Sequence, residues 1–234
     1  AMTTKATSAV GVDIGGTGIK GALVDLARGE LLSDRVKVAT PAGAEPADVL
    51  DAVLHVLGAL GVSDADIPLG VAFPAIVKNG RTLSAANGDD TWVGFEAEKF
   101  CGDGLGRDIH LASDADVAGV AEARYGAARD TAGLTILTTL GTGIGSALIY
   151  RGTLVPNVEL GHLEPDGHDA ETRAASSIKD KESLSYKKWT TERLQPYYSH
   201  VEMLFSPDLF VVGGGVSKDW DKFGPLLELR TPIV

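Results

Sequence analysis

Two short glycine loops, each between strand-like runs, carry residues suited to binding an anion. Glycine lets backbone N–H groups face an anion without interference from a Cβ atom. In the first loop, DIGGTGIK at 13–20, the Asp13 carboxylate can hold a hydrated Mg²⁺ while Lys20 meets phosphate oxygens. These parts suit phosphoryl transfer. The phosphate-binding candidates are Asp13, Gly15, Gly16, Thr17 and Lys20 in the first loop and Gly141, Thr142 and Gly143 in the second.

The two loops belong to an internal repeat. Residues 15–24 read GGTGIKGALV and residues 140–149 read LGTGIGSALI, which agree at six of ten positions without gaps. Each copy follows an apolar run and leads into another, so each predicts a strand, a glycine turn and a strand. Two related halves could hold one phosphate chain between them. Chance similarity among Gly-Thr-Gly turns is the plainer alternative.

The first loop also invites two other interpretations. The run GTGIKG at 16–21 has the spacing of the dinucleotide-binding fingerprint, but that fingerprint opens a helix, and ALVDL after Gly21 alternates as a strand does. The phosphate loop of nucleotidases requires glycine before its lysine, where this chain has Ile19 before Lys20. A purely structural alternative is a tight hairpin with Asp13 at a strand end and Lys20 in solvent.

A second carboxylate, Asp114, stands where a predicted strand, DIHLA at 108–112, gives way to a predicted helix, DVAGVAEARYG at 116–126. Ligands of open α/β sheets gather at the carboxyl ends of strands. Asp114 is therefore placed to accept the proton of an alcohol that attacks phosphorus. The alternative is that Ser113 or Asp114 only caps the helix.

The segment ELGH at 159–162 combines Glu159 and His162, whose acceptors and donors can grip adjacent hydroxyls of a pyranose. Acidic and histidine residues crowd the stretch that follows, so a metal site is a competing hypothesis. They are Glu164, Asp166, His168, Asp169 and Glu171. Asn87, within AANGDDTW, is a candidate third sugar contact, although Asn before Gly is more often a turn residue.

Helical and strand patterns alternate along the rest of the chain, as an α/β fold requires. Residues 46–60 predict an amphipathic helix between Pro46 and Gly61, and LFVVGG at 209–214 predicts a strand that enters a glycine turn. We expect two lobes. Residues 1–115 would hold the first loop and Asp114, and residues 116–234 the second loop, the ELGH segment and the distal glycine turn.

Composition excludes several classes of function. The chain has 32 acidic and 21 basic residues and a net charge of −11, which opposes binding to nucleic acid or to an anionic membrane. The single cysteine, Cys101, cannot form an internal disulfide and favours a reducing cytoplasm. The N-terminal residues lack a long apolar run, so we expect neither a signal peptide nor a membrane span.

Taken in order, DIGGTGIK, SDADVAGVAEARYG, LGTGIGS, ELGH and LFVVGGGVS resemble the ROK family, which comprises sugar kinases and sugar-responsive repressors of the actin-like superfamily. DGHDAE and HVEMLFSPDLFVVGGGVSK are most similar to its polyphosphate glucokinase branch, including the polyphosphate/ATP glucomannokinases. The resemblance covers nearly the whole chain. It implies an α/β, actin-like (ribonuclease-H-like), two-lobed sugar kinase fold with mixed sheets and flanking helices, which closes over a hexose.

The resemblance also implies roles for residues. Asp114 would be the catalytic base on the sugar 6-hydroxyl, Glu159 and His162 would bind the sugar, and Glu171 and Asn87 would add further sugar contacts. Gly213, Gly214 and Gly215 would line the nucleotide or distal-phosphate end of the cleft. The implied reaction moves a phosphoryl group from polyphosphate, with ATP as a second donor, to glucose or mannose in the presence of Mg²⁺. A homodimer is a further expectation.

This sequence departs from the family pattern in three ways. Ser113 stands where the family usually has Asn, which shortens one side-chain contact to the sugar. No cysteine cluster follows His162, so we expect no structural zinc. The closing C-terminal helix of the family is not found after LRTPIV.

The choice of phosphoryl donor depends on residues 173–193, which hold six basic and three acidic side chains. Such a run can guide a polyanion such as polyphosphate, or can form an ordinary solvated helix face with charge pairs. A sugar-sensing regulator without catalysis is the alternative function. The absence of a helix-turn-helix segment before the first strand, together with the acidic charge, favours the enzyme.

Overall fold

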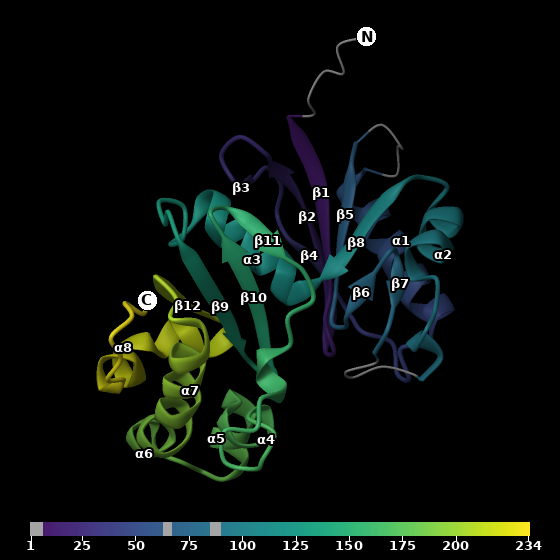
Figure 1. The fold of residues 1–234 in the computed structure, drawn as a ribbon. Helices are drawn as coiled ribbons and strands as arrows, with labels where there is room; N and C mark the ends of the chain where they lie inside the picture. The colour runs from purple at the N-terminus through teal and green to yellow at the C-terminus, as the bar shows by residue number, and fades with distance from the viewer. Residues whose placement is uncertain (1–6, 63–66, 85–89) are drawn as a thin grey trace. The chain divides into compact units, whose positions relative to one another are not determined.

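The computed structural model describes residues 7–62, 67–84 and 90–234. The chain divides into two compact units, Ala1–Asp114 and Ala115–Val234, each with its own sheet and core. Figure 1 shows both sheets with their helices.

Unit 1 is built on a six-stranded mixed sheet of order β3-β2-β1-β5-β8, with β4 also paired to β2. β1 and β2 form an antiparallel hairpin, and β1, β5 and β8 run parallel to one another. The strands are β1 Ser8–Ile14, β2 Gly18–Asp25, β3 Glu30–Leu31, β4 Val36–Ala39, β5 Leu69–Phe73 and β8 Ile109–Ser113, beside a separate hairpin of β6 Val77–Lys78 and β7 Arg81–Thr82.

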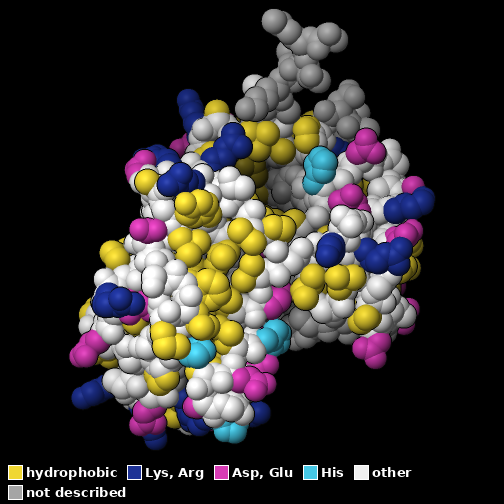
Figure 2. Space-filling model, viewed as in Figure 1, with side chains coloured by type: hydrophobic (Ala, Val, Ile, Leu, Met, Phe, Trp, Pro, Cys, Tyr) yellow, Lys and Arg dark blue, Asp and Glu magenta, His cyan; other side chains and the backbone are white. Residues whose placement is uncertain are grey.

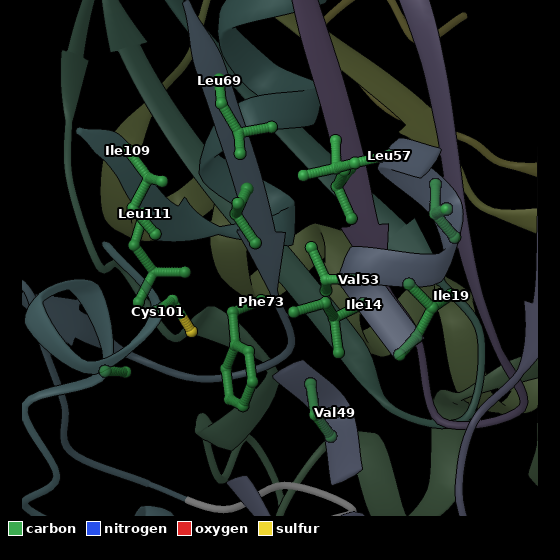
Figure 3. Packing of buried hydrophobic residues seen from close by; sticks show 14 of the residues in the cluster. Ile14, Ile19, Val49, Val53, Leu57, Leu69, Phe73, Cys101, Ile109 and Leu111 are labelled. Carbon is green, nitrogen blue, oxygen red and sulfur yellow. The ribbon is translucent and has the colours of Figure 1, made fainter. Parts of the chain in front are cut away.

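The core of unit 1 forms where helices α1 (Pro46–Leu60) and α2 (Ala97–Leu105) pack on this sheet. The predicted helix at 46–60 is confirmed, and Gly61 ends it with a φ of 67°, in the left-handed region that favours glycine. Figure 3 shows Val53 and Leu57 among the strand residues, with Cys101 near Phe73. Burial raises the pKa of the Cys101 thiol to about 11, so this cysteine is a core residue and is not a reactive one.

Unit 2 is built on a four-stranded sheet of order β11-β10-β9-β12. β9 and β10 form an antiparallel hairpin, and β12 lies parallel to β9. The strands are β9 Leu134–Leu140, β10 Ile144–Tyr150, β11 Thr153–Val155 and β12 Leu209–Gly213. The helices are α3 Asp114–Tyr125, which begins at the last residue of unit 1, and α4 Glu171–Ala174, α5 Ser176–Lys181, α6 Tyr186–Trp189, α7 Gln195–Phe205 and α8 Trp220–Phe223.

Large aromatic side chains fill the core of unit 2 between its sheet and the helices that follow β11. Trp189, Tyr197, Tyr198, Phe210 and Phe223 are all 1% exposed or less. Tyr198 meets Phe210 edge to face at 5.3 Å between ring centroids, an arrangement that adds to the free energy of burial. No helix in the described part of the chain has the length and the apolar composition needed to cross a bilayer.

The sequence repeat corresponds to a repeat of structure. Both copies form the predicted strand, glycine turn and strand, as β1-β2 and as β9-β10. The repeat extends beyond the loops, because the order β2-β1-β5 in unit 1 matches β10-β9-β12 in unit 2, with the outer strand parallel in both. The two hairpins are therefore equivalent parts of two related sheets, which argues against chance similarity.

Candidate active site

The first glycine loop places Asp13 and Lys20 side by side. They are directly opposed in the register of β1 and β2, and Lys20 Nζ lies 3.6 Å from Asp13 Oδ2. Both side chains are substantially exposed, at 39% for Lys20 and 49% for Asp13. The loop between them is closed by a hydrogen bond from Gly15 N–H to Gly18 O at 3.1 Å. A carboxylate and an ammonium group thus stand beside a glycine turn, with water access to both.

Strand β2 follows this loop directly, which removes the dinucleotide-binding interpretation because that fingerprint must open a helix. A residue outside the hairpin also stabilises the first glycine loop, since the Thr40 hydroxyl donates a hydrogen bond of 2.5 Å to Gly15 O. Gly18 packs closely on β4, since a Cβ atom there would lie 3.2 Å from Val38 O and 2.8 Å from Cε of the flexible Lys37 side chain.

Asp114 lies at the junction of β8 and α3. It is exposed, and Ser113 before it is buried. The sequence predicts it between a strand and a helix, and the structure confirms this; the strand is β8, which lies parallel to β5, as β5 does to β1. An exposed carboxylate at the carboxyl end of a strand is available to a ligand, as general base catalysis requires.

Asp116, two residues further along α3, anchors the segment that precedes Glu159. Its Oδ2 accepts a hydrogen bond from Asn157 N–H at 2.9 Å, and its Oδ1 is buried with no partner among the described residues. Burial raises the pKa of this carboxyl, although the hydrogen bond from Asn157 partly opposes the shift. Sequence reasoning missed this role, because the two residues lie 41 positions apart.

The second glycine loop is held by the start of α5. Gly141 N–H donates to Gly143 O at 3.0 Å, and Ser177 N–H donates to Gly141 O at 3.1 Å. The Ser177 hydroxyl donates to Thr142 O at 2.7 Å, and the Ser176 hydroxyl donates to Gly141 O at 3.1 Å. Two serines thus bind the loop carbonyls. Sequence analysis did not predict this contact, since two serines at 176 and 177 give no local sign of the loop that they bind.

Glu171, predicted as a sugar ligand, lies against this second loop. Its Oε2 accepts a hydrogen bond from Ile144 N–H at 3.1 Å. A Cβ atom at Gly143 would stand 2.3 Å from the same Oε2, so only glycine lets the carboxylate approach. The structure therefore brings together a phosphate-loop candidate and a sugar-site candidate that lie 28 positions apart in the sequence, at 143 and 171.

His162 lies in a 3₁₀ turn, Leu160–His162, which follows the half-buried Glu159. Its Nδ1 is 2.7 Å from Asp169 Oδ2 and 4.0 Å from Glu171 Oε1. The hydrogen bond with Asp169 raises the pKa of the imidazole above its usual range; burial acts against this rise, and the charges of Glu171, Asp169 and Glu159 add to it. Sequence reasoning had treated Asp169 only as one of several acidic neighbours.

The geometry leaves only some of the acidic and histidine residues at 162–171 as possible metal ligands. Of the described residues, His162, Asp169 and Glu171 offer ligand atoms within 4.8 Å of one another. Glu164, Asp166 and His168 are not part of that group. The three donors also make the protein contacts given above, which account for their arrangement without a cation.

The distal glycine turn packs directly on the second loop. Gly214 has a φ of 88°, in the left-handed region, and a Cβ atom there would stand 2.5 Å from Leu140 O. Leu140 immediately precedes the loop at 141–143, so residues 213–215 and that loop lie side by side. Within unit 2 the structure thus gathers the second loop, the glycine turn, Glu171 and His162.

The basic run at 173–193 is less available than its composition suggests. Arg173 pairs with Asp166 at 3.2 Å between nitrogen and oxygen, Arg193 pairs with Glu182 at 3.2 Å, and Lys179 pairs with Asp180 at 2.5 Å. The others are the exposed Lys181, Lys187 and Lys188, which form no ion pair with any described residue. Figure 2 shows basic and acidic side chains interspersed at the helical end of this unit.

The predicted sugar ligand Asn87 lies outside the described residues, so its proposed sugar contact stays a prediction.

An open groove of about 1050 Å³ in unit 1 is lined by Leu69 and Ile109, at the amino ends of β5 and β8. It includes none of the predicted site residues, and ligands of such sheets bind at the opposite, carboxyl ends.

Comparison with known proteins agrees with these features. A polyphosphate glucokinase of Mycobacterium tuberculosis is 47% identical over 225 residues, which are 96% of this chain and 83% of that protein. A polyphosphate glucokinase of Mycobacterium leprae is 46% identical over 235 residues, covering 100% of this chain and 71% of that protein.

Solved structures show the same likeness. The inorganic polyphosphate/ATP-glucomannokinase of Arthrobacter sp. strain KM is 50% identical, with a TM-score of 0.93 over 98% of this chain and 92% of that one. A ROK glucokinase of Streptomyces griseus, in complex with glucose and AMPPNP, is 22% identical and shares the fold, with a TM-score of 0.77 over 97% of this chain and 93% of that one. The model of the ROK family matches residues 9–175. The chain therefore belongs to the ROK family, and it has the actin-like two-lobed fold of that family's sugar kinases.

Proposed function

We propose that this protein is a polyphosphate-dependent glucokinase, which transfers a phosphoryl group to the 6-hydroxyl of glucose and also accepts ATP as donor. The observation that carries the proposal is the 47% identity to a polyphosphate glucokinase along 96% of the chain. Mannose is the second sugar to test, since the Arthrobacter protein with 50% identity is a glucomannokinase.

In the proposed reaction Asp114 is the general base. Its exposed carboxylate at the end of β8 accepts the proton of the sugar 6-hydroxyl as that oxygen attacks the terminal phosphorus. One oxygen–phosphorus bond forms on the sugar, and the bond from the terminal phosphorus to the donor chain breaks. The products are glucose 6-phosphate and a donor shortened by one phosphate.

The glycine loops are proposed to bind the donor phosphates. Asp13 suits a hydrated Mg²⁺, because its carboxylate is half exposed and stands at a glycine turn. Bound there, Mg²⁺ would neutralise charge on the donor phosphates. Lys20 already lies 3.6 Å from Asp13 and can turn to a phosphate oxygen, since it is exposed. Thr142 and Gly143 of the second loop and the turn at 213–215 are proposed to supply further backbone N–H groups, while Gly141 N–H closes the loop.

The sugar is proposed to bind Glu159, His162 and Glu171. Two carboxylates accept hydrogen bonds from hydroxyl groups, and the imidazole adds a third polar contact. Glu171 is held by Ile144 N–H and His162 by Asp169, so both side chains are oriented before the sugar arrives. Such preorganisation lowers the entropy cost of binding.

For the donor, the exposed Lys181, Lys187 and Lys188 on α5 and α6 are the proposed contacts of a long polyphosphate chain. The other three basic side chains of residues 173–193 form ion pairs, so only half of the six cations lack an ion pair with a described residue and are available to polyphosphate. Polyphosphate affinity should therefore fall with salt, but with a modest slope. The single, buried Cys101 suits the reducing cytoplasm in which we expect this reaction.

One experiment tests the function. Purified protein is incubated with glucose, Mg²⁺ and long-chain polyphosphate without nucleotide, and glucose 6-phosphate is measured. A second reaction contains ATP in place of polyphosphate. Absence of product in both reactions would refute the proposal. Asp114→Asn should lower kcat by about 10²-fold or more and leave glucose affinity nearly unchanged. Glucose binding without turnover in the unmodified protein would instead favour a sugar sensor.

A further inference from the structure

The Asp169 carboxylate is hydrogen-bonded through both of its oxygens, one of them to His162. Asp169 Oδ2 lies 2.7 Å from His162 Nδ1, and Asp169 Oδ1 accepts a hydrogen bond from Glu171 N–H at 3.2 Å. The main-chain oxygen of Asp169 accepts the Thr172 hydroxyl at 2.7 Å. Both carboxylate oxygens are thus occupied, one by the imidazole and one by the backbone at the start of α4.

The chain between these residues is folded so that Asp169 returns to His162. Ala170 N–H donates to Leu163 O at 2.8 Å, which closes the segment 163–170 into a loop. Gly167 has a φ of 78°, a left-handed conformation that makes the reversal possible. The position of Asp169 is therefore set by backbone hydrogen bonds that do not depend on the imidazole.

We propose that Asp169 is a positioning residue for sugar binding, which fixes the ring orientation of His162 and holds its proton on Nδ1. The inference rests on the proposed function, in which His162 contacts the sugar. In a neutral imidazole one nitrogen donates and the other accepts, and the partner of one nitrogen decides the state of the other. With Nδ1–H donated to Asp169, Nε2 is the atom presented to a sugar hydroxyl.

The same loop contains a matched control. Asp166 is a carboxylate on the same loop, three residues before Asp169, and it pairs with Arg173 at 3.2 Å at the surface. Its side chain is 58% exposed, against 33% for Asp169. Removing Asp166 changes the charge of the loop by the same amount but leaves His162 and its partner in place.

The test compares Asp169→Ala and Asp166→Ala with the unmodified protein. We expect Asp169→Ala to raise the glucose KM about tenfold, with kcat within about twofold and the polyphosphate KM unchanged. Asp166→Ala should match the unmodified protein in glucose KM and kcat; its polyphosphate KM is no control, because Arg173 loses its partner. Ring ¹⁵N chemical shifts of His162, assigned with a His162→Gln variant, should show the Nδ1–H tautomer in the unmodified protein and a mixture in Asp169→Ala.

An unchanged tautomer or an unchanged glucose KM in Asp169→Ala overturns the inference. A stoichiometric divalent metal that is present in the unmodified protein and lost in Asp169→Ala also overturns it, because Asp169 would then be a metal ligand. If Asp169→Ala does not fold, Asp169→Asn keeps the side-chain shape but loses one acceptor, and its ring spectrum decides in the same way.

The ring spectrum separates this inference from the proposed function, because it needs no turnover. An unmodified protein that forms no glucose 6-phosphate refutes the function whatever the spectrum shows. An active protein whose His162 tautomer is indifferent to Asp169 refutes only the positioning role.

Discussion

Replacing Gly143 by alanine should damage the sugar site through Glu171, although residue 143 belongs to the phosphate loop. The new Cβ would stand 2.3 Å from Glu171 Oε2, far inside van der Waals contact, and 3.1 Å from its Cδ, which is tighter than an ordinary contact. The carboxylate must move, and its hydrogen bond from Ile144 N–H at 3.1 Å is lost. Ile144 is 2% exposed, so water cannot easily replace that partner.

The size of the effect follows from that hydrogen bond. A hydrogen bond to a charged group contributes about 1.5–3 kcal/mol, and we take the lower end because the Glu171 side chain is 32% exposed. About 1.5 kcal/mol corresponds to a fall in Tm of roughly 3–6 °C for a chain of this size. Displacement of one sugar ligand by a similar free energy lowers kcat/KM for glucose about tenfold.

The assay is glucose 6-phosphate formation at varied glucose and saturating polyphosphate, with thermal unfolding measured alongside. Gly141→Ala is the matched control, since no atom lies within 4 Å of a Cβ built there. It should keep the glucose KM and the Tm of the unmodified protein, and any effect it has should fall on the donor KM. Equal glucose kinetics and equal Tm for the two variants would refute the steric argument.

Three further predictions concern buried polar groups. Tyr197→Phe should leave Tm unchanged or raise it, because the buried Tyr197 hydroxyl has no partner among the described residues. Tyr198→Phe should lower the free energy of unfolding, measured by chemical denaturation, by about 1 kcal/mol, since it loses the 2.6 Å hydrogen bond with the Thr138 hydroxyl. Equal losses of stability in the two variants would contradict this reasoning. Asp116→Asn should be tolerated better than Asp116→Ala in thermal unfolding, because an amide oxygen can still accept the hydrogen bond from Asn157 N–H; the reverse order would rule out its anchoring role. Burial raises the pKa of this carboxyl and makes the unmodified protein less stable as pH rises, so the Tm that Asp116→Asn loses relative to it should shrink with rising pH. Burial opposes ionisation of Glu202, but hydrogen bonds from Thr231 and the nearby Arg230 lower its pKa, so Glu202→Gln should reduce Tm at pH 7 and the difference should vanish as pH falls below about 4; a pH-independent difference would disagree.

Local sequence patterns were enough to predict the elements that carry the site. The hairpins at 15–24 and 140–149 follow from a period-two apolar pattern on either side of glycine, a short-range signal. The helix at 46–60 follows from apolar spacing between a proline and a glycine. Neighbouring residues were likewise enough to predict that Asp114 lies at the end of a strand. The ROK family membership inferred from these motifs is confirmed by the comparisons.

Only the tertiary structure could decide which polar groups meet. Asp116 binds Asn157 across 41 positions, and Glu171 binds Ile144 across 27, contacts that depend on how the helices pack and leave no periodic trace in the sequence. The same holds for charge: composition counts the cations at 173–193, but packing decides that three are paired and three are exposed. Sequence thus determined the chemistry available, through residue type and local spacing, while long-range packing determined which groups are held in place to use it.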